Sequence, residues 1–178
     1  MTTTIAKDDH VKGDAHARVT LIHFADYRCP YSAAAHPVVK ATLSHFEGRA
    51  RYVYRHFPLT ELHPAALPLA RFAEAAGQQG FFWQAHDFLF GFQREITDER
   101  LARFIDELGI DPARFDAALE SEATTRRVMR DVESGKTLGV HKTPSFWIDG
   151  KLYQDEWHRS GLRDEIAAAL EASDGLAR

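Results

Sequence analysis

The chain has 178 residues, of which 44% are hydrophobic and 27% are charged, and this composition is typical of a single globular domain. Its 22 basic and 26 acidic residues give a net charge of −4 without a long basic run, so we expect no nucleic-acid partner. A single cysteine excludes an internal disulfide, and no segment has the length and hydropathy of an export signal or a membrane span, so we expect a cytoplasmic protein without a membrane partner.

The first regular elements are expected within residues 19–46. Residues 1–18 are polar and predict an arm that leads into the first strand. The segment Val19–Ala25 is rich in β-branched and apolar residues and predicts a buried strand. Apolar residues then recur at helical spacing over residues 31–46, and this pattern stops at Gly48. A strand followed directly by a helix is therefore predicted here.

The only cysteine, Cys29, lies at the predicted turn between this strand and this helix. Pro30 follows it in the first helical position, which proline favours. Unpaired amide groups and the helix dipole stabilise an anion at such a terminus, so we expect Cys29 to be a solvent-accessible, nucleophilic thiolate. The alternative is a buried and inert cysteine that packs as a small apolar residue. The position at the turn favours the reactive interpretation.

The strand, the acidic turn and the sequence Cys29-Pro30-Tyr31-Ser32 resemble the DsbA-like branch of the thioredoxin superfamily. This resemblance implies a thioredoxin-like fold in which Cys29 attacks disulfides and Pro30 and Tyr31 contact the substrate. Members of the family carry a second cysteine where this chain has Ser32. Without that thiol, Cys29 cannot close an internal disulfide, but it can form a mixed disulfide with glutathione or with a protein client.

His23 lies six residues before Cys29, where the resemblance implies a buried acidic residue that manages the proton of the thiol. A histidine at this position can act as a base, or as a cation that favours the thiolate. The alternative is a core histidine that is satisfied by hydrogen bonds. The sequence favours neither interpretation.

A second strand is predicted at Ala50–Phe57, and the pattern over residues 63–138 is helical throughout. No linker of proline, glycine and serine flanks these helices. We therefore predict one α/β domain with a thioredoxin-like fold, in which a helical insertion at about residues 61–138 separates a β-α-β half from a β-β-α half. The core of the fold is expected at about residues 17–60 and 139–172.

The segment after the predicted helices contains Thr143 and Pro144, followed by an apolar strand. Asp149-Gly150 predicts the turn of a β-hairpin, and a last helix is predicted around residues 162–170. The resemblance implies that Pro144 is a cis-proline beside Cys29. The backbone of Thr143 can then pair with a bound peptide or with glutathione.

Three functions fit these features. The first is a thiol-disulfide oxidoreductase that acts through Cys29 alone, with glutathione or a thiol-containing or disulfide-containing protein as its partner. The second is a glutathione transferase or isomerase, because kappa-type enzymes resemble this fold with a serine at the attacking position. The third is a peptide-binding module without turnover. None of the ten histidines forms a close ligand pair along the chain, so we expect no metal, and we expect no tightly bound cofactor.

Overall fold

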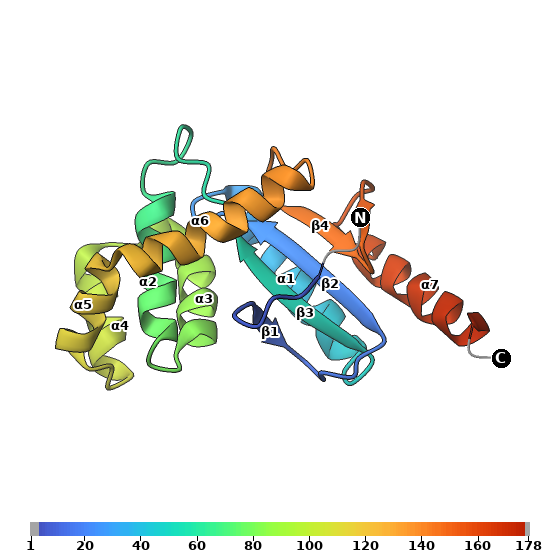
Figure 1. The fold of residues 1–178 in the computed structure, drawn as a ribbon, viewed down its shortest axis with the longest axis horizontal. Helices are drawn as coiled ribbons and strands as arrows, with labels where there is room; N and C mark the ends of the chain where they lie inside the picture. The colour runs from blue at the N-terminus through green and yellow to red at the C-terminus, as the bar shows by residue number, and fades with distance from the viewer. Residues whose placement is uncertain (1–3, 177–178) are drawn as a thin grey trace.

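The computed structural model describes residues 4–176 and contains a five-stranded sheet with helices on both faces (Figure 1). The strand order is β1-β3-β2-β4-β5. The strands are β1 (His10–Lys12), β2 (Val19–Ala25), β3 (Ala50–His56), β4 (Ser145–Ile148) and β5 (Lys151–Tyr153).

Strands β2 and β3 are parallel and are joined by helix α1 (Pro30–His45). A parallel pair requires a crossover connection, and α1 supplies it behind the sheet in Figure 1. Strand β4 runs antiparallel to β2, and the β4–β5 hairpin turns at Asp149 and Gly150, which both have positive φ angles of 47° and 80°. The predicted order of a β-α-β half, a set of helices and a β-β-α half is confirmed.

Strand β1 was not predicted. His10, Val11 and Lys12 pair antiparallel with the outer edge of β3, so part of the polar N-terminal arm belongs to the sheet. A three-residue strand with two polar members gives no period-2 signal, and its pairing depends on β3, which is remote in sequence. The arm covers one edge of the sheet as a result.

The helices between β3 and β4 gather at one end of the sheet, and the last of them extends from there across one face of the sheet (Figure 1). Thr97, Asp111 and Ser121 cap three of them by accepting a hydrogen bond from a backbone amide in the first turn. The predicted division into an insertion at residues 61–138 and a core stays a prediction. The elements are α2 (Ala66–Gly77), α3 (Phe82–Gly91), the 3₁₀ helix η1 (Gln93–Glu95), α4 (Asp98–Glu107), α5 (Pro112–Glu120) and α6 (Glu122–Thr137).

Each face of the sheet packs against its own set of helices. One face carries Leu21, Tyr52 and Phe146, and α1 and α7 (Gly161–Leu176) pack against it. The other face carries Phe24 and Trp147, and the C-terminal half of α6 covers it. The alternation along β2 and β4 divides these side chains between the two faces, as the period of a strand requires.

Helix α6 approaches the sheet closely at Gly135. A Cβ atom at this position would lie 2.7 Å from Cδ2 of Phe57 and 3.1 Å from Cδ1 of Phe24. A larger residue would therefore push α6 away from the sheet. Glycine allows the helix to pack directly on these two rings.

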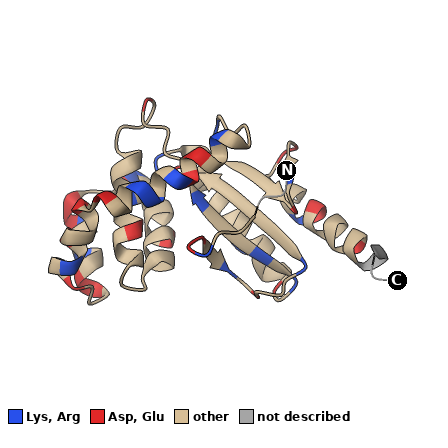
Figure 2. Ribbon diagram, in the orientation of Figure 1, with Lys and Arg blue, Asp and Glu red and all other residues tan. Residues whose placement is uncertain are grey.

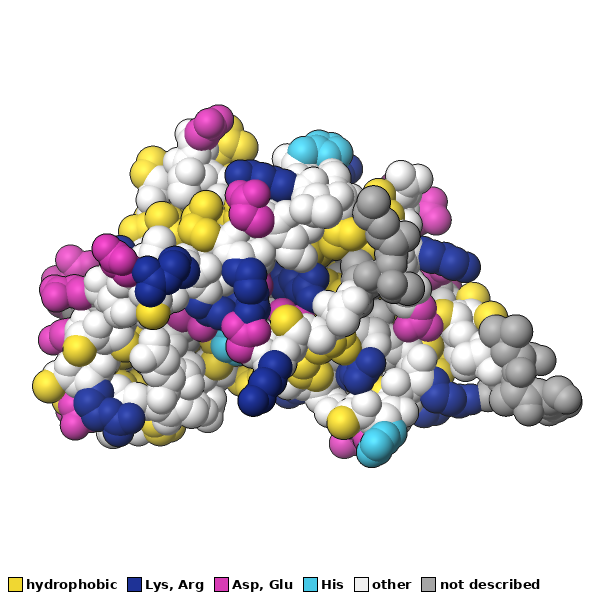
Figure 3. Space-filling view, in the orientation of Figure 1, with side chains coloured by type: hydrophobic (Ala, Val, Ile, Leu, Met, Phe, Trp, Pro, Cys, Tyr) yellow, Lys and Arg dark blue, Asp and Glu magenta, His cyan; other side chains and the backbone are white. Residues whose placement is uncertain are grey.

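Ion pairs join the N-terminal arm to β3 and α6. Arg55 of β3 pairs with Asp9 at 2.8 Å, and both side chains are almost fully buried. Arg127 pairs with Asp131 along α6, and Asp131 also accepts a hydrogen bond from the backbone amide of His56. Figure 2 shows basic and acidic residues interspersed along α6, and Figure 3 shows both kinds of side chain meeting where α6 crosses the sheet.

Candidate active site

Cys29 ends the turn that follows β2 and is the N-cap residue of α1. Its backbone amide donates to the carbonyl oxygen of Asp26 at 3.1 Å, and its own carbonyl accepts from Ala33 at 3.1 Å. Pro30 occupies the first helical turn and loses no hydrogen bond there. Cys29 therefore lies at the positive end of the dipole of a 16-residue helix, and the side chain of Cys29 does not cap this end by a hydrogen bond.

The loop before β4 brings Thr143 and Pro144 to this helix terminus. The Thr143–Pro144 peptide bond is cis. The thiol of Cys29 donates to the carbonyl oxygen of Thr143 at an Sγ–O distance of 3.2 Å. This contact belongs to the protonated thiol, because a thiolate has no proton to donate.

The expectation that Cys29 is solvent-accessible is wrong for this conformation. Only 4% of the residue is exposed, and the backbone of Thr143 covers part of the thiol. The sequence predicted an exposed Cys29 because Cys29 begins a helix. A helix start does not indicate which distant loop packs over it. A substrate that reacts with Cys29 must therefore replace the contact with Thr143.

The neighbours of Cys29 in the motif differ in exposure. Tyr31 is 69% exposed and offers an aromatic surface beside the thiol. Ser32 is fully buried, and its hydroxyl accepts from the backbone amide of Asp26 at 3.5 Å. Pro30 lines a surface pocket of about 310 Å³ together with Phe92 and Gln93. That Pro30 and Tyr31 contact the substrate stays a prediction.

A buried carboxylate holds the turn that carries Cys29. Asp26 accepts hydrogen bonds from the backbone amide of Arg28 at 2.7 Å, from the backbone amide of Leu59 at 3.0 Å and from Nδ1 of His63 at 2.8 Å. Its side chain has no exposed surface. The turn before α1 is thus fixed to the loop that follows β3. The acidic turn was noted in the sequence, but its partners are 33 and 37 positions away and gave no signal.

Gln93 fixes the same turn from the helical segment. Its side-chain amide donates to the carbonyl oxygen of Tyr27 at 2.8 Å and to that of Cys29 at 3.0 Å. Arg28 donates in return to the backbone carbonyl of Gln93 at 2.8 Å. The sequence gave no indication of this role, because Gln93 follows a run of aromatic residues and its partners are more than 60 positions away.

His23 lies in the core, on the face of the sheet that packs against α1. Its Nδ1 and the hydroxyl of Tyr52 are 2.9 Å apart, and its ring stacks on Phe146 at a centroid distance of 4.4 Å. Burial lowers the pKa of His23 to about 3, so the imidazole is neutral near pH 7. A positively charged His23 that favours the thiolate therefore does not fit the structure. A role as a base stays a prediction.

Comparisons with known proteins agree with this geometry. A family model described as thioredoxin matches residues 5–168. The alpha-DsbA1 protein of Wolbachia pipientis has a similar fold, with a TM-score of 0.82 at 17% identity over 99% of this chain and 98% of that one. A thioredoxin-like oxidoreductase from Silicibacter pomeroyi gives a TM-score of 0.77 at 24% identity over 96% of this chain and 94% of that one.

A curated relative that is named as an antiporter is much longer than this chain. The Na(+)/H(+) antiporter NhaA 3 of Salinispora tropica is 35% identical over 165 residues, which are 93% of this chain and 25% of that protein. The chain thus spans about a quarter of the length of this relative. Within residues 4–176, no helix is both long enough and apolar enough to cross a membrane. The match over residues 5–168 and the DsbA-like fold show that the chain belongs to the thioredoxin family.

Proposed function

We propose that the protein is a thiol-disulfide oxidoreductase that works through Cys29 alone, with glutathione or a protein client as the partner thiol. The observation that carries this proposal is the contact between Cys29 at the start of α1 and the carbonyl oxygen of Thr143. In this contact the only thiol of the chain lies beside a backbone segment that can pair with an extended substrate.

The proposed reaction has two exchange steps. The thiolate of Cys29 attacks one sulfur of a substrate disulfide, a mixed disulfide forms at Cys29, and the other substrate sulfur leaves as a thiolate. A glutathione thiolate then attacks the substrate sulfur of the mixed disulfide. This step releases the Cys29 thiolate and leaves the substrate joined to glutathione.

Ser32 defines the difference from a dithiol enzyme. Its hydroxyl is buried one helical turn after Cys29, where the resemblance implies a second cysteine. A hydroxyl cannot resolve a mixed disulfide, so an external thiol must take that part. Because this chain has Ser32 in place of a second cysteine, the rate of the proposed exchange should depend on the concentration of glutathione.

A turnover assay tests the proposal. A glutathionylated peptide is offered with reduced glutathione, and the release of oxidised glutathione is followed. We expect catalysis by the native protein, none by Cys29→Ser and full activity in Ser32→Ala. Activity that survives Cys29→Ser contradicts the proposal. Conjugation of glutathione to an electrophile by the Cys29→Ser variant would favour the transferase alternative, and peptide binding without turnover would favour the binding module.

A further inference from the structure

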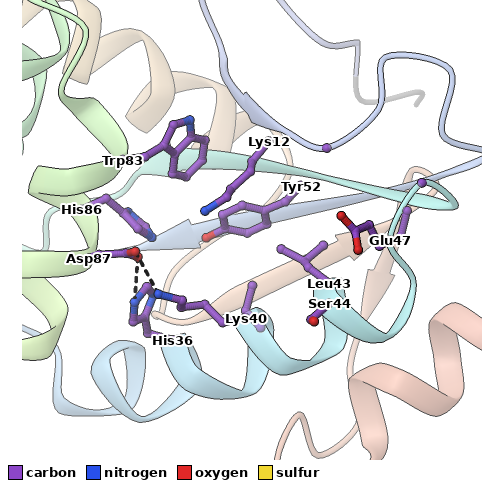
Figure 4. Close-up of a pocket in the computed structure, with 14 residues that line it drawn as sticks. Lys12, His36, Lys40, Leu43, Ser44, Glu47, Tyr52, Trp83, His86 and Asp87 are labelled. Atoms are coloured by element: carbon purple, nitrogen blue, oxygen red, sulfur yellow. Dashed lines mark hydrogen bonds and ion pairs between the residues drawn. The ribbon is translucent and has the colours of Figure 1, made fainter.

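A second cavity lies further along α1 than Cys29, between this helix, β3 and α3 (Figure 4). Its volume is about 400 Å³. The proposed exchange reaction uses none of the side chains that line it. Those with polar or aromatic groups include His36 and Lys40 of α1, Tyr52 of β3, and Trp83, His86 and Asp87 of α3.

Three of these side chains have the donor atoms of a metal site. Nε2 of His36 lies 3.1 Å from Oδ1 of Asp87. One donor atom from each of His36, His86 and Asp87 lies within 4.8 Å of the other two. Ligand atoms of a tetrahedral Zn²⁺ ion lie about 3.3 Å apart, as follows from bonds of about 2.0–2.1 Å. Small rotations of the side chains would therefore close the set around an ion.

Two of these side chains, His86 and Asp87, have second contacts of the kind that orient metal ligands. The hydroxyl of Tyr27 lies 3.1 Å from Nδ1 of His86, so a proton on Nδ1 leaves the lone pair of Nε2 free. Nζ of Lys40 bonds to Oδ2 of Asp87 at 2.8 Å and leaves Oδ1 for the site. Second contacts of this kind orient ligands and hold a histidine in one tautomer.

The surroundings separate this cluster from a structural ion pair. His86 is almost fully buried and His36 is largely buried, whereas the side chain of Asp87 is 38% exposed and borders the cavity. Figure 4 shows the three side chains together at one end of the cavity, with Trp83 above them. An ion has a path to the ligands, and one of its coordination positions would face open space.

We propose that His36, His86 and Asp87 bind a divalent transition-metal ion, with Zn²⁺ as the ion that their two imidazoles and one carboxylate fit best. Three protein ligands with a fourth position open to a cavity are the arrangement of a zinc site that accepts a water molecule or a small anionic ligand. The earlier expectation of no metal rested on the spacing of histidines along the chain. Folding brings these ligands together from two helices, α1 and α3. The spacing of histidines along the sequence therefore does not reveal such a site.

A second cluster in the structure provides a matched control. His10 and His56 both bond to the same oxygen of Glu74, at 2.7 and 2.9 Å. Arg127 lies 3.8 Å from this oxygen, so a cationic side chain borders this cluster as Lys40 borders the proposed site. This cluster ties β1 and β3 to α2 and α6 as an ion-paired network. Like the proposed site it has two histidines and one carboxylate, but none of these three residues lines the cavity of Figure 4.

Zn²⁺ titration of the full chain against a chromogenic chelator tests the proposal. We expect one equivalent to bind, with affinity reduced about 10- to 100-fold in Asp87→Asn and in His36→Gln. His10→Gln and Cys29→Ser should bind as tightly as the native protein. Co²⁺ in place of Zn²⁺ should give visible absorption bands that Asp87→Asn loses, while far-UV circular dichroism verifies that the variant is folded. Asp87→Asn decides the matter if His36→Gln does not fold.

Three results would overturn the site. The native protein could fail to bind Zn²⁺, Asp87→Asn could bind it unchanged, or binding could be lost in Cys29→Ser or His10→Gln. The last result would assign the ion to the thiol or to the other cluster. The Cys29→Ser variant also separates this inference from the exchange reaction, because it abolishes that reaction and should leave the metal site intact.

Discussion

The sulfur of Cys29 lies 3.2 Å from the carbonyl oxygen of Thr143, although 114 positions separate the two residues in the sequence. The contact joins the start of α1 to the loop that enters β4. A substrate sulfur bonded to Cys29 removes the thiol proton and therefore breaks this contact. We propose that the backbone of Thr143 then pairs with the substrate.

The first prediction concerns the buried carboxylate of Asp26. Asp26→Asn replaces a group that accepts three hydrogen bonds with an amide whose nitrogen cannot accept any. We expect a loss of about 2–4 kcal/mol in the free energy of unfolding, because at least one buried donor is left without a partner. Denaturant unfolding measures this loss. Asp116→Asn, on the exposed face of α5, is the control and should change nothing. Native stability in Asp26→Asn would contradict the account of the turn.

The second prediction concerns Gln93, which donates to the carbonyl oxygens of Tyr27 and Cys29. Gln93→Met keeps the volume and removes both hydrogen bonds, and we expect it to cost about 1–2 kcal/mol of stability. Gln93→Glu should cost more, because a carboxylate would face two carbonyl oxygens. Denaturant midpoints and the alkylation rate of Cys29 are measured together. Equal stability in Gln93→Glu and the native protein would show that this contact does not hold the turn.

Sequence reasoning placed Cys29 at the start of a helix but did not find the residues that support this turn. The strand–turn–helix pattern predicted the position of Cys29, because hydrophobic periodicity and the place of Pro30 are local signals. Asp26 and Gln93 act through partners that only the folded chain brings near them. The same limit applies to β1, whose three residues become a strand by pairing with β3.

His23 shows a different limit. Its residue type and its distance from Cys29 along the chain allowed a charged or basic role, and burial is what removes the charge. Tyr52 and Phe146, which surround it, come from two other strands. Charge state follows from desolvation, and a sequence pattern reports desolvation only indirectly.

The third prediction concerns acid stability. The pKa of His23 is about 3 in the folded protein and 6.5 in the unfolded chain. Below pH 6.5 the unfolded chain therefore binds a proton that the folded protein does not, and stability falls as the pH is lowered from about 6 to 3. The expected loss from His23 is on the order of 1 kcal/mol per pH unit in this window. Denaturant unfolding at several pH values measures it.

A double variant isolates the contribution of His23. His23→Leu combined with Tyr52→Phe removes both members of the buried hydrogen bond, so neither polar group is left unpaired. Its stability should depend less on pH than that of the native protein. The same slope in both proteins would assign the acid sensitivity to other groups, among them His86, whose pKa burial also lowers.

The fourth prediction concerns Ser32. Residues 29 and 32 lie one helical turn apart on the same side of the start of α1. Ser32→Cys should therefore form an internal disulfide with Cys29 and gain activity in the reduction of insulin, whereas Ser32→Ala should not. Thiol counts in the native and the denatured states measure the disulfide. Two free thiols after oxidation would show that the two side chains do not approach each other.

The most direct test of the central claim is the mass of the intact, folded protein after incubation with oxidised glutathione. The account predicts one glutathione adduct on Cys29, its complete reversal by dithiothreitol, and no adduct on Cys29→Ser. The same incubation in denaturant is the control for the thiol itself. An adduct that forms only in denaturant would contradict the claim, since it would show that Cys29, with 4% of its surface exposed, is an inert core residue.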